Sequence, residues 1–517
     1  MNGAHALIGT LEANDVTVCF ANPGTSEMHF VAALDDSRVD AVLCLFEGVA
    51  TGAADGFARA SGRSAATLLH LGPGLANGWA NLHNARRART PVLNIVGDHA
   101  TYHAVYDAPL QSDIERMAST LEGWSRRTLT PDALAGDAAD ALSAAYGPPG
   151  AVATLVVPAD VSWGDVTDVP PLWPVATRRD LLAIDDAALR DATLALRSGR
   201  AAIFLGGSAL TKDQLALAQR VATTASARLV VETFPTVIER GANVVSPERL
   251  IYLSEFAQAQ LLDCDAIILI GSREPVGFFA YPGVASRLVP EGCRVINLAP
   301  PGAHTGDALA ALVEGFSAPR VTIERAERPN APRGELTPHS FAAAIGATLR
   351  EDVVVVDESN TSGVHLWDAT RASPEHRWMT LTGGAIGYAL PVAIGAAVAS
   401  RQRTLVLESD GSMMYTLQAL WTMARENLDV TVVGLANRSY AILNMELRRV
   451  DAEHNGVASE RLLSLDNPTL DLAGVARSLG VPSLSVSRAE DLVNALERSY
   501  ATAGPTFIEA IFPAYQR

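Results

Sequence analysis

Short apolar runs alternate with amphipathic, helix-like stretches along most of the chain. In the first third, these apolar runs are Val16–Phe20, Ala41–Phe46, Ala65–Leu71, Pro91–Gly97 and Ala153–Pro158. Nearly continuous apolar strands that are separated by helices are typical of a parallel sheet covered on both faces. The pattern therefore predicts a doubly wound α/β domain at the start of the chain.

The same alternation occurs twice more. The second set of runs is Ala201–Gly207, Arg228–Glu232, Ala266–Gly271 and Arg294–Leu298, and the third is Val353–Asp357, Thr404–Ser409, Val430–Asn437 and Thr506–Phe512. Two Pro-bearing stretches, Val169–Pro174 and Glu324–Pro338, separate the sets and are interpreted as linkers. We expect three doubly wound parallel-sheet α/β domains, over residues 1–168, 185–323 and 338–517.

Composition narrows the class of protein. The chain has 517 residues, of which 48% are hydrophobic and 19% charged, so it can build large buried cores. Its net charge is -17 and its arginines are scattered, which argues against a nucleic-acid partner. No signal peptide is evident and no apolar run reaches the ~18 residues of a membrane helix, so we expect a cytoplasmic protein without a membrane partner.

Asp410 and Asn437 each come directly after an apolar run. Ligands of open parallel sheets bind beyond the carboxyl ends of strands, and carboxylate and amide oxygens suit Mg2+ or Ca2+. The backbone carbonyl of Ser439 is a candidate third ligand. Gly411 allows close backbone approach, and the helical pattern of Ser412–Glu426 would present N–H groups to a diphosphate. On spacing alone, an Asp-Gly turn and a strand-end Asn cap explain the same residues.

The stretch from Ser409 to Asn437 resembles the diphosphate-binding motif of thiamine-diphosphate (ThDP)-dependent enzymes, although Ser409 replaces its first glycine and Ala436 the first of its usual Asn pair. Leu45–Arg63 resembles the family's segment that carries the catalytic glutamate. Leu381–Ala397 resembles the stretch beneath the bent cofactor. The resemblance implies pyrimidine-binding, central and diphosphate-binding domains in that order.

Within this family the chain is most similar to the acetolactate synthase large subunit and benzoylformate decarboxylase branch. The similarity rests on Phe20–Phe30, Leu68–Gly78 and Asn84–Asp98. It implies a homodimer or homotetramer with active sites between subunits, where Glu47 of one chain faces Asp410 and Asn437 of another.

The resemblance also implies the cofactors ThDP and Mg2+, and roles for individual residues. Glu47 would exchange a proton with the aminopyrimidine, and burial after an apolar run would favour its protonated form. Ile386 would lie beneath the bend of the cofactor, and the Gly384 carbonyl would accept from the aminopyrimidine. The other expected cofactor contacts are Gly411, Ser412, Tyr440 and Asn360, with Asp410, Asn437 and Ser439 on the metal.

His70 lies at the end of a predicted strand, before a Gly-Pro-Gly turn. A near-neutral pKa suits a proton relay, and the decarboxylase branch is similar in carrying a His at this point. A strand-end His that caps backbone groups is the alternative. Ser26 would be the substrate-binding serine of that branch, although Thr25 competes for the place.

The expected substrate pocket comprises Leu110, Gln111 and Phe278. Gln111 is one place from the position at which acetolactate synthases carry an active-site Gln, which aligns nearer Leu110. Phe278 stands where the decarboxylase branch has a second His, and this leaves the protonation step open. Phe204–Leu210 lacks the full G-x-G-x-x-G fingerprint of a nucleotide site. FAD is not expected, because the central part of the chain lacks the Arg-Phe-Asp-Asp-Arg-like segment and the Asp-rich strand end of FAD-bearing acetolactate synthases.

The family resemblance implies a non-oxidative decarboxylase or carboligase that acts on a small-molecule 2-oxo acid through an enamine, similar to benzoylformate decarboxylase. One alternative is an acetolactate synthase catalytic subunit that condenses two pyruvates. A non-catalytic paralogue is a further alternative, against which the full set of cofactor residues argues.

Overall fold

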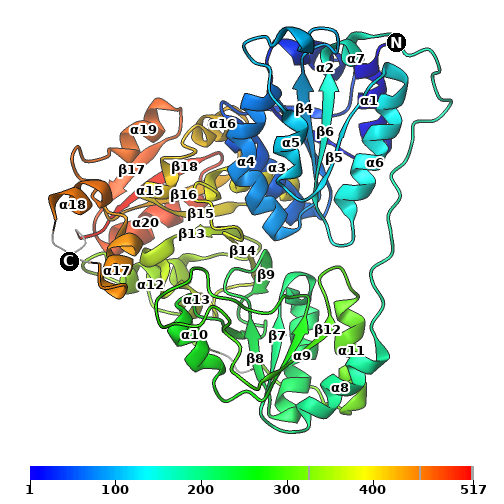
Figure 1. Ribbon diagram of the computed structural model, residues 1–517. Helices are drawn as coiled ribbons and strands as arrows, with labels where there is room; N and C mark the ends of the chain where they lie inside the picture. The colour runs from blue at the N-terminus through cyan, green and yellow to red at the C-terminus, as the bar shows by residue number, and fades with distance from the viewer. Residues whose placement is uncertain (324–325, 453–455, 514–517) are drawn as a thin grey trace.

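The computed structural model describes residues 1–323, 326–452 and 456–513, which form three sheets with helices on their faces (Figure 1). The predicted fold class is confirmed. A long extended segment joins the first part of the chain to the central part in Figure 1, and it contains the predicted linker Val169–Pro174. Of the second predicted linker, residues 324–325 lie outside the described residues. Among the helices of the described ranges, none is long and apolar enough to cross a membrane.

The first sheet has six parallel strands in the order β2-β1-β3-β4-β6-β5. Its strands are β1 Val18–Asn22, β2 Asp40–Leu43, β3 Ala65–Leu69, β4 Val92–Asp98, β5 Trp124–Arg127 and β6 Val152–Pro158. Its helices are α1 Gly3–Ala13, α2 Met28–Leu34, α3 Glu47–Ser61, α4 Leu71–Ala88, α5 Ile114–Ser119, α6 Leu134–Tyr146 and α7 Ala159–Trp163, with 3-10 turns η1 Thr25–Glu27, η2 Ala104–Tyr106 and η3 Pro131–Ala133.

Strand β4 contributes side chains to the hydrophobic cores on both faces of the first sheet. Successive side chains of a strand point to opposite faces. Val92 and Val96 belong to the core beneath α3 and α4, whereas Leu93 and Ile95 belong to the core beneath α1 and α6. A nearly continuous apolar run is therefore expected here, because neither face of the strand meets water, and the buried Asn94 that interrupts it is hydrogen-bonded to Thr67 and Thr154.

The central sheet has the parallel order β10-β8-β7-β11-β12. Its strands are β7 Ala201–Leu205, β8 Arg228–Val231, β10 Glu248–Arg249, β11 Ala266–Ile270 and β12 Arg294–Ala299. The accompanying helices are α8 Asp186–Leu196, α9 Lys212–Ala225, α10 Ser254–Leu261 and α11 Thr305–Gly315, with the 3-10 turn η4 Gly207–Leu210.

The third sheet has seven strands in the order β17-β18-β16-β15-β13-β14-β9. Its strands are β9 Val237–Arg240, β13 Val354–Glu358, β14 His376–Thr380, β15 Thr404–Ser409, β16 Val430–Ala436, β17 Ser483–Val486 and β18 Thr506–Ile511. Its helices are α12 Pro338–Thr348, α13 Leu366–Ala369, α14 Ala389–Ser400, α15 Asp410–Met413, α16 Ala419–Arg425, α17 Ala441–Arg449, α18 Val457–Leu463, α19 Leu472–Ser478 and α20 Ala489–Tyr500, with the 3-10 turn η5 Asn360–Gly363.

Strand β9 departs from the parallel pattern. It lies in the central part of the sequence, yet it pairs antiparallel with β14 at the edge of the third sheet. A strand that crosses between parts of the chain fastens the central domain to the third domain and covers one sheet edge.

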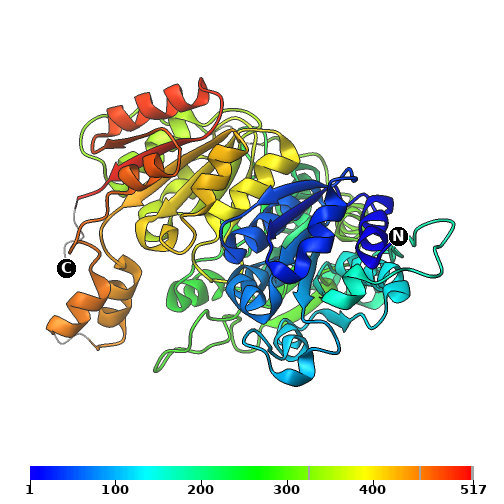
Figure 2. The same ribbon diagram turned by 90° about the horizontal axis from the view of Figure 1, so that it is seen from above.

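Helix α3 of the first domain packs directly on α14 of the third domain, and the blue and yellow ribbons meet there in both views (Figure 2). Glycines permit this close approach. A Cβ at Gly56 would lie 2.0 Å from the Val392 carbonyl oxygen, and one at Gly395 would lie 1.8 Å from that of Ala53. The two helix backbones therefore touch, and this contact sets the position of the first domain against the third.

Candidate active site

Asp410 and Asn437 meet at the carboxyl edge of the third sheet. Asp410 opens α15 after β15, Asn437 follows β16, and these two strands are neighbours in the sheet. Asp410 Oδ2 accepts the Arg438 backbone N–H at 2.7 Å, which ties one strand exit to the other. Asn437 Oδ1 accepts the Ser439 N–H at 2.9 Å. The arrangement gathers a buried carboxylate and an amide oxygen beside the backbone of Ser439.

Burial raises the pKa of Asp410 to about 6, opposed by the backbone N–H groups that it accepts. A cation bound nearby would stabilise the charged form of this carboxyl, which burial otherwise disfavours. An oxygen donor set with one carboxylate and one amide fits a hard divalent ion such as Mg2+. The described residues contain no cluster of three or more His, Cys, Asp or Glu side chains suited to a metal, so this mixed set is the candidate.

The other expected diphosphate contacts gather at the same edge. Asn360 Nδ2 lies 3.2 Å from Ser412 Oγ, and the Tyr440 ring lies so close to Gly411 that a Cβ there would stand 2.5 Å from Cε1. The helix predicted over Ser412–Glu426 is wrong as one unit, because α15 ends at Met413 and α16 begins at Ala419. In the break, Thr416 Oγ1 donates to the Gly387 carbonyl at 3.1 Å.

Residues 381–388 connect β14 to α14 and contain Gly384 and Ile386; we call them the β14–α14 turn. Gly384 and Gly387 have φ of 77° and 86°, a region that favours glycine. A Cβ at Gly384 would lie 2.7 Å from the Phe278 ring, so this predicted pocket residue does reach the turn. Its neighbours in an aromatic group are Phe234, Tyr252 and Phe279.

Two carboxyls that the sequence analysis missed hold the start of α14. Glu358 accepts the backbone N–H groups of Gly387, Tyr388 and Ala389 at 2.9, 2.8 and 2.9 Å. Glu408 accepts that of Leu390 at 3.1 Å. Burial raises the pKa of Glu358 to about 7, against the effect of these amides. The available signal was an acidic residue at the exit of each of two apolar strands.

Glu47 opens α3 at the carboxyl edge of the first sheet and is 7% exposed. Asn77 Nδ2 donates to its Oε2 at 3.0 Å. Gly74 leaves room beside the carboxyl, because a Cβ there would lie 3.3 Å from Oε1. The expected desolvated environment of this side chain is therefore present.

His70 lies between β3 and α4 and contacts Ser26, a predicted site residue, and Glu27. Its Nδ1 is 2.8 Å from Glu27 Oε2 and 3.4 Å from Ser26 Oγ. Ser26 Oγ donates to Glu27 Oε1 at 2.7 Å, so the three side chains form one cluster. A proton on Nδ1 that faces the carboxylate leaves Nε2 as an acceptor. Glu27, which is 3% exposed, was missed, although it directly follows Ser26 in the sequence.

Leu110 and Gln111 lie in the segment after β4 in the first domain. Leu110 is exposed, and Gln111 Oε1 is buried with no hydrogen-bond partner among the described residues. The rings of His99 and His103 in the same segment are 5.3 Å apart. Gln111 Nε2 donates to the Ser112 carbonyl at 3.5 Å, within its own segment. The place of Leu110 and Gln111 in a pocket stays a prediction.

Comparison with known proteins places these features in one family. The thiamine pyrophosphate enzyme N-terminal TPP binding domain matches residues 1–119, and the C-terminal TPP binding domain matches residues 361–510. A Mycobacterium tuberculosis protein with the provisional name acetolactate synthase large subunit IlvX is 50% identical over 99% of both chains. Benzoylformate decarboxylase from Pseudomonas aeruginosa is 28% identical over 96% of both.

The fold is shared with a solved structure, the ThDP-dependent 4-hydroxybenzoylformate decarboxylase from Rhodococcus jostii. It has a TM-score of 0.87, 22% identity and full coverage of both chains. Together with the matches to both TPP binding domains, these similarities show that the chain belongs to the thiamine-diphosphate-dependent enzymes, in the group that includes acetolactate synthases and benzoylformate decarboxylases.

Proposed function

We propose that the protein is a ThDP- and Mg2+-dependent enzyme that decarboxylates a 2-oxo acid without net oxidation, in the manner of a benzoylformate decarboxylase. The observation that carries this proposal is the cluster of Ser26, Glu27 and His70. It provides an imidazole with a buried carboxylate partner at the same sheet edge as Glu47. The protein would act as a homodimer or homotetramer with its sites between subunits.

The proposed cofactor site uses the residues at the edge of the third sheet. Asp410 and Asn437, with the backbone carbonyl of Ser439, would hold Mg2+ and through it the diphosphate. Gly411, Ser412, Asn360 and Tyr440 would surround the diphosphate, and Gly384 and Ile386 would support the cofactor bend. When bound, ThDP would supply a nucleophilic carbon for the 2-oxo carbonyl and an electron sink for the electron pair that remains when carbon dioxide leaves.

The chain's own residues would control protons around that chemistry. The Glu47 carboxyl would pass a proton to the aminopyrimidine ring, and burial would keep competing water away from it. His70 Nε2 would hold the proton that completes the product, while Glu27 fixes the ring through Nδ1. Ser26 Oγ would lie beside the substrate carboxylate. The aromatic side chains near Phe278 favour a 2-oxo acid with an apolar substituent.

An acetolactate synthase activity is the second candidate. It is favoured by the name of the 50% identical relative and by Phe278 at the place of the second His. In that case the pocket would hold a second 2-oxo acid as the acceptor, and His70 would not need to supply a proton. Gln111 and Leu110 would then line the acceptor side of the pocket.

A product assay separates the candidates. The purified protein with ThDP and Mg2+ would be supplied with benzoylformate and with pyruvate in separate reactions. Benzaldehyde from benzoylformate, lost in His70→Ala, supports the decarboxylase. Acetolactate from pyruvate, retained in His70→Ala, supports the synthase. Absence of carbon dioxide release from both, and from other 2-oxo acids with apolar substituents, in protein that binds ThDP would contradict both enzymes and favour a non-catalytic paralogue.

A further inference from the structure

The β14–α14 turn is held largely by side chains of the first domain. His83 Nε2 lies 3.1 Å from the Gly383 carbonyl oxygen. Asn84 Nδ2 donates to the Ala385 carbonyl at 2.8 Å. Each of these contacts crosses from α4 to the third domain of the same chain. The placement of the turn therefore depends on residues about 300 positions earlier in the sequence.

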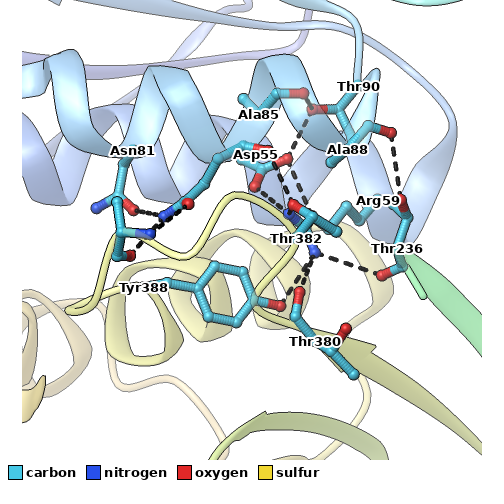
Figure 3. Close-up of polar contacts among 12 residues, drawn as sticks. Asp55, Arg59, Asn81, Ala85, Ala88, Thr90, Thr236, Thr380, Thr382 and Tyr388 are labelled. Carbon is cyan, nitrogen blue, oxygen red and sulfur yellow. Dashed lines mark hydrogen bonds and ion pairs between the residues drawn. The ribbon is translucent and has the colours of Figure 1, made fainter. Parts of the chain in front are cut away.

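Arg59 of α3 contacts both ends of this turn (Figure 3). Its Nη1 donates to the Thr380 carbonyl at 2.8 Å, and its Nη2 donates to Thr382 Oγ1 at 2.9 Å, where the chain enters the turn. Nη1 also donates to the Tyr388 hydroxyl at 3.1 Å, where the chain leaves it. One planar guanidinium thus spans the turn from entry to exit.

Asp55 orients this guanidinium. Arg59 Nε donates to Asp55 Oδ1 at 3.0 Å, and Nη2 lies 2.7 Å from Oδ2. Thr90 Oγ1 donates to Asp55 Oδ1 at 2.6 Å and fixes the carboxylate in turn. The side chains of Asp55 and Arg59 are 1% and 0% exposed, so the pair is desolvated and each charge needs the other. Asp55 therefore holds Arg59 on one side, and Nη1 and Nη2 donate to Thr380, Thr382 and Tyr388 around the turn. Nη1 also donates to the Thr236 carbonyl before β9, at a longer 3.4 Å.

We propose that Arg59, oriented by Asp55, is a positioning residue for the cofactor, because it fixes the turn that carries Gly384 and Ile386. This inference rests on the proposed role of those two residues in supporting ThDP. Gly384 and Gly387 allow the turn backbone a wide range of conformations. Contacts from outside the turn are therefore needed to hold it in one conformation. A guanidinium provides that constraint because its donors are arranged in a rigid fork.

Arg377 provides a matched comparison. It too joins the first and third domains, since its Nη1 donates to the Ala60 carbonyl at 2.9 Å and its Nη2 to Gln402 Oε1 at 2.8 Å. Arg377 lies at the opposite end of β14 from the turn. If both arginines only hold the domains together, replacing either one should change thermal stability and ThDP affinity to a similar extent. A positioning role predicts that only Arg59 affects the cofactor.

The test compares Arg59→Lys with Arg377→Lys. Lysine keeps the charge beside Asp55, but one ammonium cannot reach all three acceptors on the turn. Titration of cofactor-stripped protein with ThDP at saturating Mg2+ should show affinity reduced about tenfold in Arg59→Lys, equivalent to about 1.4 kcal/mol, and within about twofold of wild type in Arg377→Lys. Circular dichroism and thermal unfolding would establish that both variants fold.

Thr382→Val and Tyr388→Phe cover the case in which Arg59→Lys fails to fold. Tyr388→Phe removes the acceptor of Arg59 at the exit of the turn. Thr382→Val removes the acceptor at its entry together with the hydrogen bond that the Thr382 hydroxyl donates to the Asn84 carbonyl. Both leave the Asp55–Arg59 pair intact. We expect each to weaken ThDP binding about threefold and to lower kcat at saturating ThDP, with a smaller change in the substrate KM. Wild-type affinity in these variants, or an equal loss in Arg377→Lys, would overturn the inference. The binding readout needs no substrate, so the result is independent of which reaction the product assay finds.

Discussion

The carboxyl edges of the first and third sheets place acidic side chains in contrasting surroundings. At the first edge, Glu27 Oε2 lies 2.8 Å from a His70 ring nitrogen, and Glu47 is bonded by an amide side chain. At the third edge, Asp410 and Glu358 direct their carboxylate oxygens mainly to backbone N–H groups. Side chains that face a titratable or mobile partner can exchange protons, whereas those that accept several backbone amides are fixed in place.

This difference suggests a division of labour between the two edges. In our proposal, the first edge supplies the groups that move protons, and the third edge holds the metal and cofactor. Substitutions at the first edge should then lower turnover and leave ThDP affinity intact. Substitutions at the third edge should lower affinity first. A first-edge variant that loses ThDP affinity, or a third-edge variant that loses turnover alone, would contradict this division.

Glu47→Gln should produce the largest change. Glutamine keeps the size of the side chain and a partner for Asn77, but it cannot pass a proton to the cofactor. We expect kcat to fall about 1,000-fold, within the range of lost general acid–base catalysis, and ThDP affinity to change less than about threefold. Steady-state kinetics at saturating ThDP and a ThDP titration give the two values. Unchanged turnover would contradict the proposed role of Glu47.

Asp410→Ala should have the opposite signature. Loss of a charged metal ligand costs about 3 kcal/mol, so the apparent affinity for ThDP with Mg2+ should fall about 100-fold. Asp429→Ala is the matched control, because Asp429 precedes β16 at the other end of the sheet and pairs with Arg403. The control should lose some thermal stability and retain ThDP affinity. Full affinity in Asp410→Ala would refute the metal site.

Glu27→Gln tests the partner of the imidazole. A neutral amide cannot stabilise a charged His70, so we expect kcat to fall about tenfold while ThDP affinity stays unchanged. Ser26→Ala in the same cluster should raise the substrate KM with a smaller effect on kcat. If Glu27→Gln leaves both kcat and its pH profile unaltered, His70 is a structural residue and the synthase reading gains support.

The sequence predicted those parts of the site that follow from local order along the chain. Asp410, Asn437 and Glu47 each follow an apolar run, and the exit of a parallel strand is where a side chain reaches the sheet edge. The three-sheet fold was predictable for the same reason, because the alternation of apolar and amphipathic stretches is a local signal.

Other parts depended on contacts between distant segments. Nothing in Val237–Arg240 indicates that it joins the third sheet as β9, since its partner β14 lies more than 130 residues later. Nothing in the sequence around Glu358 indicates its role, because that role comes from its hydrogen bonds to the first backbone amides of α14, about 30 residues later. The break in Ser412–Glu426 was missed because the helical periodicity continues through it. Long-range hydrogen bonds decide these features, and one sequence does not display them.

Glu232 at the carboxyl edge of the central sheet should give the smallest effect. It accepts the Gly207 N–H at 3.1 Å, and burial raises its pKa to about 7, against that amide and the charges of Arg89 and Arg87. Because the folded-state pKa lies above the ordinary value of about 4.5, the folded protein binds the extra proton. The contribution of Glu232 to the free energy of unfolding is therefore fully present below pH ~4.5 and is lost as the pH rises through about 7.

Glu232→Gln should therefore stabilise the protein at pH 8 by about 1 kcal/mol, a value reduced for partial solvent screening, and should change it little at pH 5. Glu248→Gln is the control with opposite sign, because Arg228 holds the pKa of Glu248 below its ordinary value despite partial burial. Thermal unfolding of both variants at pH 5 and pH 8 measures these two changes in stability. Neither should alter ThDP affinity, since the central edge has no part in the proposed cofactor site; a loss in Glu232→Gln would show that the central edge also supports the cofactor.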